Sequence, residues 1–233
     1  GFSSTSSSKY SSNLLPKGSC SDLCGISENK KPPLWNIIFE NNCEECGEAT
    51  INPAALDLDE IAHQAAIKPH AARAAAGSVS QLILHQISRL DRQALLQSCD
   101  DIEDAGEVTI REKILESLMH RFEVYTPYKA QILALDVAAR RDPLLGIRLL
   151  DSLVQTMRAL LRMAGDDLIG LRGETRVRGL AFVAMLVARE WQKDETADLS
   201  LTMKAIDARL AQAEEWGRSL CVLGNGNKAS SSG

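Results

Sequence analysis

The chain has 233 residues, of which 45% are hydrophobic and 24% are charged, and its formal net charge is −5. These values are typical of a globular protein, and the negative charge argues against a chain-wide electrostatic surface for nucleic acid. Aromatic residues make up only 4%, which argues against a β-sandwich or β-barrel because those folds recruit aromatic side chains into strands. The longest apolar run, 180–188, is far shorter than the roughly 20 residues that a membrane-spanning helix needs.

The composition of the chain changes near residue 52. Residues 1–52 contain no arginine and are rich in Ser, Lys, Asn and Cys, whereas the following residues are rich in Ala, Leu and Arg. We therefore expect an irregular Ser/Cys-rich extension over 1–52, a helical body over 53–219 and a flexible tail over 220–233. The first eight residues are Ser-rich and lack acids, which resembles the remainder of a cleaved mitochondrial presequence. The expected location is mitochondrial, and the alternative for this stretch is a linker or cloning remnant.

Four cysteines of the extension form two pairs, each followed by glycine: Cys20 with Cys24, and Cys43 with Cys46. Four thiolates at this spacing would satisfy a closed tetrahedral site for one structural zinc ion. The second pair has the usual C-x2-C spacing and the first pair is one residue longer. Two disulfides, or four free thiols in a low-complexity arm, are the alternatives.

The region 53–100 carries helix start signals. Asp57 or Asp59 is expected to cap a short helix, Pro69 to open a second, and Ser78 to cap a longer helix that ends near residue 99. An acidic linker is expected over 100–107.

The region 101–219 shows apolar stripes at helical spacing, and it contains no credible strand. Asp142 followed by Pro143 is a start signal for a further helix. We therefore predict an all-α fold. The stripes are Ile110, Ile114, Leu118 and Phe122; Ile132, Leu135 and Ala139; Leu145, Leu149, Leu153, Met157 and Leu160; Val177, Leu180, Ala184, Val187 and Trp191; and Leu199, Met203, Ile206, Leu210 and Ala213.

The helix expected over 174–191 is apolar on more than one side, because Phe182, Met185 and Leu186 lie off its main stripe. A helix that is apolar nearly all round is buried on two sides. Together with the final helix it could form half of a four-helix homodimer interface through 174–219, or it could be central to the monomer.

The helical body resembles the TetR family of bacterial regulators. Residues 56–67, Leu-Asp-Leu-Asp-Glu-Ile-Ala-His-Gln-Ala-Ala-Ile, look like the first helix of its helix-turn-helix. The segments 111–123, 127–130, 141–144 and 191–210 resemble helices of its ligand domain. The same fold occurs in the mitochondrial lipid-binding protein of ubiquinone biosynthesis. The resemblance implies a degenerate helix-turn-helix over 53–100 and a C-terminal helical bundle over 101–219.

The chain departs from this family where the family binds DNA. TetR-type recognition helices usually carry Tyr, Phe and Lys at positions where this chain has Arg73, Ala76 and Val79. The residual DNA-facing residues are Lys68, His70 and Arg73, and acids lie beside them at Asp57, Asp59 and Glu60. Specific DNA binding needs several phosphate and base contacts, so we expect it to be lost or weak.

Motifs of hydrolases, metalloproteases, phosphate-binding loops and dinucleotide-binding folds are missing from the sequence, so we expect no enzymatic activity. We predict a non-catalytic accessory subunit of a large mitochondrial assembly, whose partners are other protein subunits. The alternatives are a lipid- or quinone-binding protein and a dimeric TetR-type regulator. A ligand pocket, if present, would be lined by Leu118, Phe122, Leu135, Leu153, Met157 and Phe182.

Overall fold

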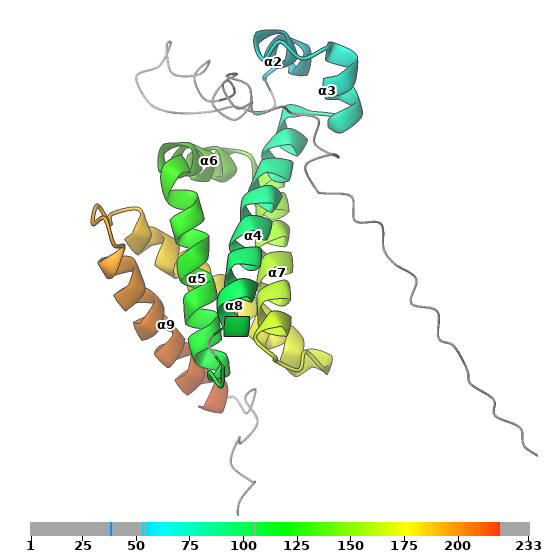
Figure 1. Cartoon of the computed structure of the whole chain (residues 1–233). Coiled ribbons are helices and arrows are strands. Elements are labelled where there is room, and N and C mark those ends of the chain that lie inside the picture. The colour runs from blue at the N-terminus through cyan, green and yellow to red at the C-terminus, as the bar shows by residue number, and fades with distance from the viewer. Residues whose placement is uncertain (1–37, 39–52, 54, 105, 220–233) are drawn as a thin grey trace, which may run out of the picture. The chain divides into compact units, whose positions relative to one another are not determined.

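The computed structural model describes residues 38, 53, 55–104 and 106–219, and these residues form helices joined by short turns (Figure 1). The described residues contain no strand, which confirms the all-α prediction. No helix among them is both long enough and apolar enough to span a membrane. The helices are α2 (Leu58–Gln64), α3 (Pro69–Ala75), α4 (Val79–Asp104), α5 (Ile110–Tyr125), the 3-10 turn η1 (Thr126–Tyr128), α6 (Lys129–Arg141), α7 (Pro143–Met163), α8 (Gly170–Trp191) and α9 (Ser200–Ser219).

The helix boundaries follow the start signals in the sequence. The Asp57 carboxylate accepts a hydrogen bond from the Asp59 amide at the start of α2, and Pro69 opens α3. Asp142 accepts from the first amides of α7. At the start of α5, Thr109 and Glu112 form a reciprocal capping box, which satisfies two backbone donors at once.

The predicted linker at residue 100 was wrong at its start. Helix α4 continues for five residues beyond Cys99 and ends at Asp104. It continues because α4 packs along α5, where Ser98 is buried and Ile102 is half-buried, and such packing overrides a composition typical of a loop. The expected domain boundary at residue 100 therefore lies inside a helix.

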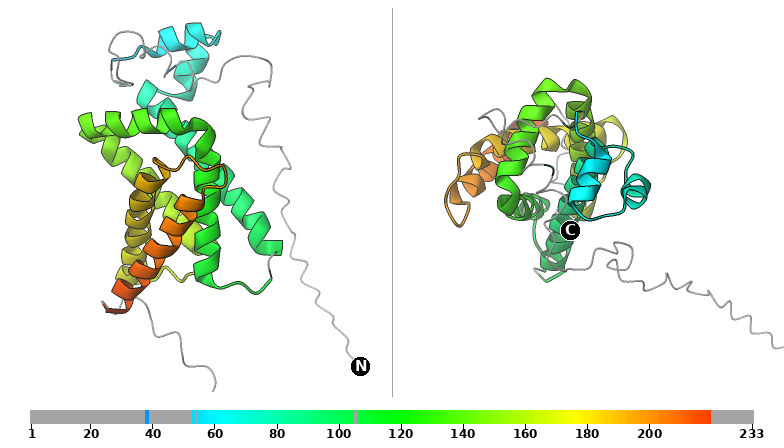
Figure 2. Two further views of the ribbon diagram at one scale, coloured as in Figure 1. Left: turned by 90° about the vertical axis from the view of Figure 1, so that its left-hand side faces the viewer. Right: turned by 90° about the horizontal axis from the view of Figure 1, so that it is seen from above.

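Two clusters of buried side chains hold the helices together. The main core draws on α4, α5, α7, α8 and α9, and its largest buried side chains include Phe122 and Trp191, whose ring centroids lie 5.7 Å apart. The second core joins α2, the first turns of α4, α6 and the start of α7. Figure 2 shows the helices from two further sides; α4 and α7 both contribute buried side chains to the two clusters.

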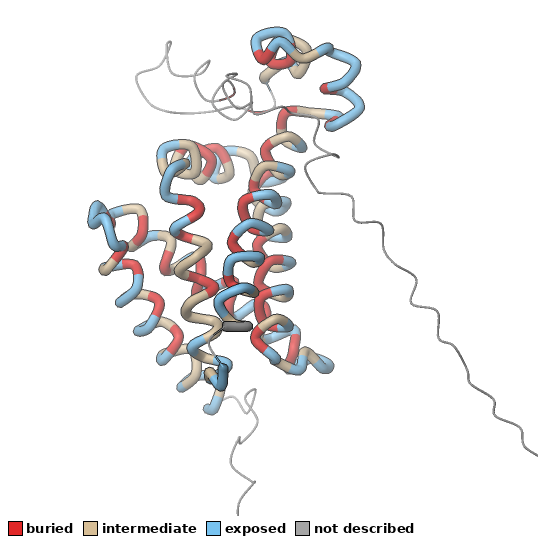
Figure 3. The backbone as a smooth tube through the Cα atoms, in the orientation of Figure 1, coloured by how far each residue is buried: buried red, intermediate tan, exposed pale blue. Residues whose placement is uncertain are grey.

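Each helix of the bundle is buried along one side and exposed along the other (Figure 3). On α8 the predicted stripe of Val177, Leu180, Ala184, Val187 and Trp191 is buried, as expected. Phe182 and Met185 are 47% and 40% exposed, so within this chain α8 is buried on one side and not on two.

Candidate functional site

The cysteine pairs Cys20/Cys24 and Cys43/Cys46 lie outside the described residues, as do the tail 220–233 and the extension 1–52 apart from Ile38. The zinc prediction for the two pairs therefore stays a prediction. Ile38 is helical and 1% exposed, and it belongs to the second core.

The helices α2 and α3 hold the residues that were expected to face DNA. Lys68, His70 and Arg73 are all exposed. The Arg73 guanidinium, however, donates two hydrogen bonds to the Asp59 carboxylate of α2, with Nε 2.9 Å from Oδ1. This hydrogen bond and the charge of Asp59 raise the pKa of Arg73.

The ion pair makes Arg73 less available to bind a phosphate group at the α2–α3 surface. A guanidinium already bonded to a carboxylate through two N–H groups must release that partner before it binds DNA phosphate. Asp57 and Glu60 add further negative charge around α2. Lys68, which directly precedes α3, is then the only lysine or arginine of 57–75 with no ion pair among the described residues. The acids beside Arg73 were noted from the sequence, and the structure shows which one binds it.

The six residues expected to line a ligand pocket separate into three places. Leu118, Phe122, Leu153 and Met157 lie together in the main core. Leu135 belongs to the second core. Phe182 lies on the exposed side of α8, away from both. The four that meet are at most 9% exposed and pack on one another as core side chains do.

A buried polar cluster, which the sequence analysis missed, lies between α4, α5 and α7. Asp91 of α4 is 2% exposed. Its Oδ1 accepts hydrogen bonds from Arg121 Nε at 2.8 Å and Tyr125 Oη at 2.7 Å, and its Oδ2 accepts from Thr156 Oγ1 at 2.8 Å. Arg121 also donates to Tyr125 Oη at 3.0 Å. The two charged side chains of the cluster, Asp91 and Arg121, therefore pair with each other.

The protonation states of this cluster follow from its geometry. Burial and the neighbouring Asp91 raise the pKa of Tyr125 far above its ordinary value, so the phenol is neutral and donates its proton to Asp91. Burial alone would lower the pKa of Arg121, but Asp91 and Tyr125 raise it above its ordinary value. Arg121 therefore keeps its charge inside the bundle, beside the Asp91 carboxylate.

One signal in the sequence could have revealed the cluster. Asp91 occupies a buried position of the α4 stripe, next to Leu90 and one turn before Ala94. An unpaired acid at a core position is costly, so it predicts a buried cation or donor on a facing helix. Arg121 and Tyr125 supply both from positions i and i+4 of α5.

A second buried acid organises the turn between α8 and α9. Asp194 is 3% exposed. Its Oδ2 accepts hydrogen bonds from the amide and the hydroxyl of Thr202, each at 2.7 Å, and its Oδ1 accepts from Thr196. The Asp194 carbonyl accepts from Lys129 Nζ at 2.7 Å, and that ammonium lies 5.5 Å from the Trp191 ring centroid. These contacts join the α8–α9 turn to the start of α6.

We expect Asp194 to make stability depend on acid pH. Burial would raise the pKa of Asp194, but the hydrogen bonds from Thr196 and Thr202 outweigh it and lower the value to about 2. A lowered folded-state pKa gives stability that is present above the ordinary pKa and is lost as pH falls towards about 2. Asp194→Ala should therefore cost about 2 kcal/mol at neutral pH. Urea unfolding at several pH values should show this difference from the wild type shrinking below about pH 4.

The exposed side of α8 carries a row of apolar and basic residues, which we call the α8 outward face: Leu171, Arg178, Phe182, Met185 and Arg189. The spacings of seven, four, three and four residues place them on one side of the helix. Leu171 is 87% exposed, and both arginines are exposed as well. This face offers a partner an apolar centre flanked by two positive charges.

Helix α7 exposes a second apolar group formed by Leu144, Ile147 and Leu150. These residues lie in the first half of the helix, and Ile147 is 64% exposed. Isolated exposed apolar side chains are ordinary, but groups of them mark surfaces that bind other molecules.

Comparison with known proteins adds no family to this picture. No protein-family model matches the sequence, and no curated protein matches it either.

Proposed function

We propose that this chain is a non-catalytic accessory subunit that binds another protein through the α8 outward face, in an assembly expected to be mitochondrial. The single observation that carries the proposal is the exposure of Phe182 and Met185 between Arg178 and Arg189. Burying these apolar side chains against a partner stabilises the complex by about 25 cal/mol for each Å² of apolar surface that is removed from water. The arginines then favour a partner whose apolar surface has an acidic rim.

The charges of the face favour a different protein over a second copy of this chain. In an antiparallel two-fold contact centred between Phe182 and Met185, residues whose numbers add up to 367 lie opposite each other. Phe182 then meets Met185 of the other copy, and Arg178 meets its Arg189. Two arginine pairs in one contact would repel, whereas an acidic rim on another protein would attract both.

The two other functions from the sequence analysis receive less support. The guanidinium of Arg73 is hydrogen-bonded to Asp59, which weakens the case for a DNA-binding regulator. Leu118, Phe122 and Met157 are at most 1% exposed and fill the main core, which weakens the case for a lipid carrier. The buried acids Asp91 and Asp194 accept hydrogen bonds from other residues of this chain, which supports a structural and non-catalytic role for them.

We expect the protein, in gently solubilised source material, to migrate in a particle much heavier than its own 25.4 kDa. The paired variant Phe182→Glu/Met185→Glu should leave that particle, because each buried anchor of an interface contributes about 2 kcal/mol, or about 30-fold in affinity. The measurement is native mass with identification of the partners that migrate at fixed stoichiometry.

Leu96→Glu is the matched control, because Leu96 is 60% exposed on α4 and lies outside the α8 outward face. It should stay in the particle, and circular dichroism should show that all variants remain helical. A native mass of one chain would contradict the proposal, and a mass of two chains would identify the partner as a second copy. Duplex DNA binding that falls with salt and is lost in Arg73→Ala would favour the regulator instead.

A further inference from the structure

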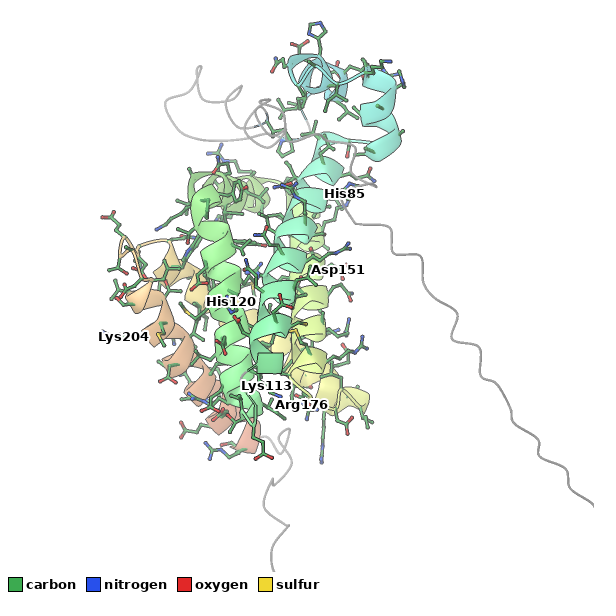
Figure 4. The ribbon with its side chains drawn as sticks, in the orientation of Figure 1. His85, Lys113, His120, Asp151, Arg176 and Lys204 are labelled. Atoms are coloured by element: carbon green, nitrogen blue, oxygen red, sulfur yellow. The ribbon has the colours of Figure 1, made fainter. Side chains whose placement is uncertain are left out.

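A histidine and two carboxylates meet between α4 and α5. Asp101 lies in the last turn of α4, and Glu116 and His120 lie one turn apart on α5. One ligand atom of each residue lies within 4.8 Å of the others. His120 is labelled on α5 in Figure 4. The site shares no residue with the α8 outward face.

The two nitrogens of His120 have different surroundings. Nδ1 lies 3.3 Å from the Glu123 carboxylate, which can accept its proton and so hold the ring in one tautomer. In that tautomer Nε2 carries a lone pair. It is shielded from solvent, and no acceptor or donor of the described residues meets it in hydrogen-bond geometry. A carboxylate that fixes one nitrogen while the other is left open is the arrangement that orients metal-binding histidines.

The lone pair of Nε2 faces negative charge. The Asp101 carboxylate oxygen lies 2.6 Å away, which is repulsive unless a positive charge lies between or beside the two atoms. Among the described residues, no Lys or Arg pairs with Asp101 or Glu116. The site therefore holds two carboxylates that no Lys or Arg of the described residues neutralises, beside an imidazole.

The end of α4 adds to this unbalanced charge. Its last five residues include four acids, at positions 100, 101, 103 and 104, and its last turn has no basic residue. Helix C-termini carry partial negative charge, so acids there are unfavourable and a cation is stabilising.

We propose that Asp101, Glu116 and His120 bind one divalent transition-metal cation of the Zn²⁺ class. Imidazole and carboxylate are ligands that Zn²⁺ accepts, at about 2.0–2.2 Å, which places tetrahedral ligand atoms about 3.3 Å apart. The His120 Nε2 and Asp101 Oδ2 atoms lie 2.6 Å apart, and all three ligand atoms lie within 4.8 Å of one another, so side-chain rotations suffice. Water completes the coordination, because Asp101 is 49% exposed. The bound ion ties the end of α4 to α5.

The test is a zinc titration of the full chain by calorimetry, with Cys20, Cys24, Cys43 and Cys46 replaced by serine so that the two cysteine pairs do not contribute. We expect one equivalent to bind this parent. His120→Ala and Glu116→Gln should each weaken binding at least about tenfold. His85→Ala is the matched control, since His85 is exposed nearer the opposite end of α4 (Figure 4), and it should bind like the parent.

Two results would overturn the site. One is a parent that binds no zinc, which would mean that His120 simply pairs with Asp101 and Glu123. The other is His120→Ala binding zinc as tightly as the parent. Glu116 is in no ion pair within the described residues, and glutamine keeps the shape of its side chain. We therefore expect Glu116→Gln to stay folded, so that it tests metal binding even if His120→Ala unfolds.

Discussion

Replacing Asp91 with asparagine should lower the free energy of unfolding by about 3–5 kcal/mol. Asp91 is the carboxylate that pairs with Arg121 inside the bundle, at 2.8 Å between Oδ1 and Nε. Asparagine keeps the volume of the side chain but removes its charge, so the buried guanidinium loses its counter-ion. It also puts an amide donor where Asp91 now only accepts, next to donors on Tyr125 and Thr156. Denaturant unfolding monitored by circular dichroism measures the effect.

Asp136→Asn is the control for this prediction. Asp136 pairs with Arg140 one turn later on α6, at 2.7 Å, but the two side chains are 42% and 68% exposed. Exposed pairs of this kind contribute little, so the variant should differ from the wild type by no more than about 0.5 kcal/mol. Equal losses in the two variants would show that the buried cluster is not what stabilises this part of the bundle.

Replacing Gly173 with alanine should destabilise the fold by about 3 kcal/mol or more. Gly173 is buried in the first turn of α8, where the chain just before the helix crosses it. A Cβ at Gly173 would lie 2.4 Å from the backbone carbon of Leu168 and 2.8 Å from its carbonyl oxygen. Backbone cannot rotate aside as a flexible side chain can, so the turn between α7 and α8 would have to move. Thermal unfolding should show the loss.

Gly179→Ala gives a matched comparison in the same helix. A Cβ at Gly179 meets nothing within 4 Å, and alanine has the higher helix propensity. This variant should be more stable than the wild type by about 0.5–1 kcal/mol. If both variants shift the melting temperature in the same direction, the close approach at Gly173 is not the cause.

Local signals in the sequence were sufficient to predict most of the helices. Asp57, Pro69 and Asp142 act on amides or dihedral angles within a few residues, and the structure confirms each of them. The buried stripe of α8 was also correct, because its period follows from helix geometry alone. The end of α4 was wrong, since the acids after Cys99 are typical of a loop and only contact with α5 keeps them helical.

The polar clusters could not be placed from the sequence because their partners are distant in the chain. Asp91 binds Arg121 thirty residues later and Thr156 sixty-five residues later. Asp194 binds Lys129 over a similar separation. Pattern analysis shows that Asp91 falls on a buried face, but the facing side chain depends on how the helices are arranged. For Arg73, the sequence suggested three nearby acids, and only the structure shows that Asp59 is the one that binds it.

The passage of α4 through both clusters of buried side chains has a consequence for how the protein unfolds. Val79, Ile83 and Ile87 belong to the second core, while Leu90 and Ala94, further along the same helix, belong to the main core. Tyr128 and Ile132 also pack against both. Because each cluster shares these side chains with the other, we expect the helices of the two clusters to unfold together as one cooperative unit.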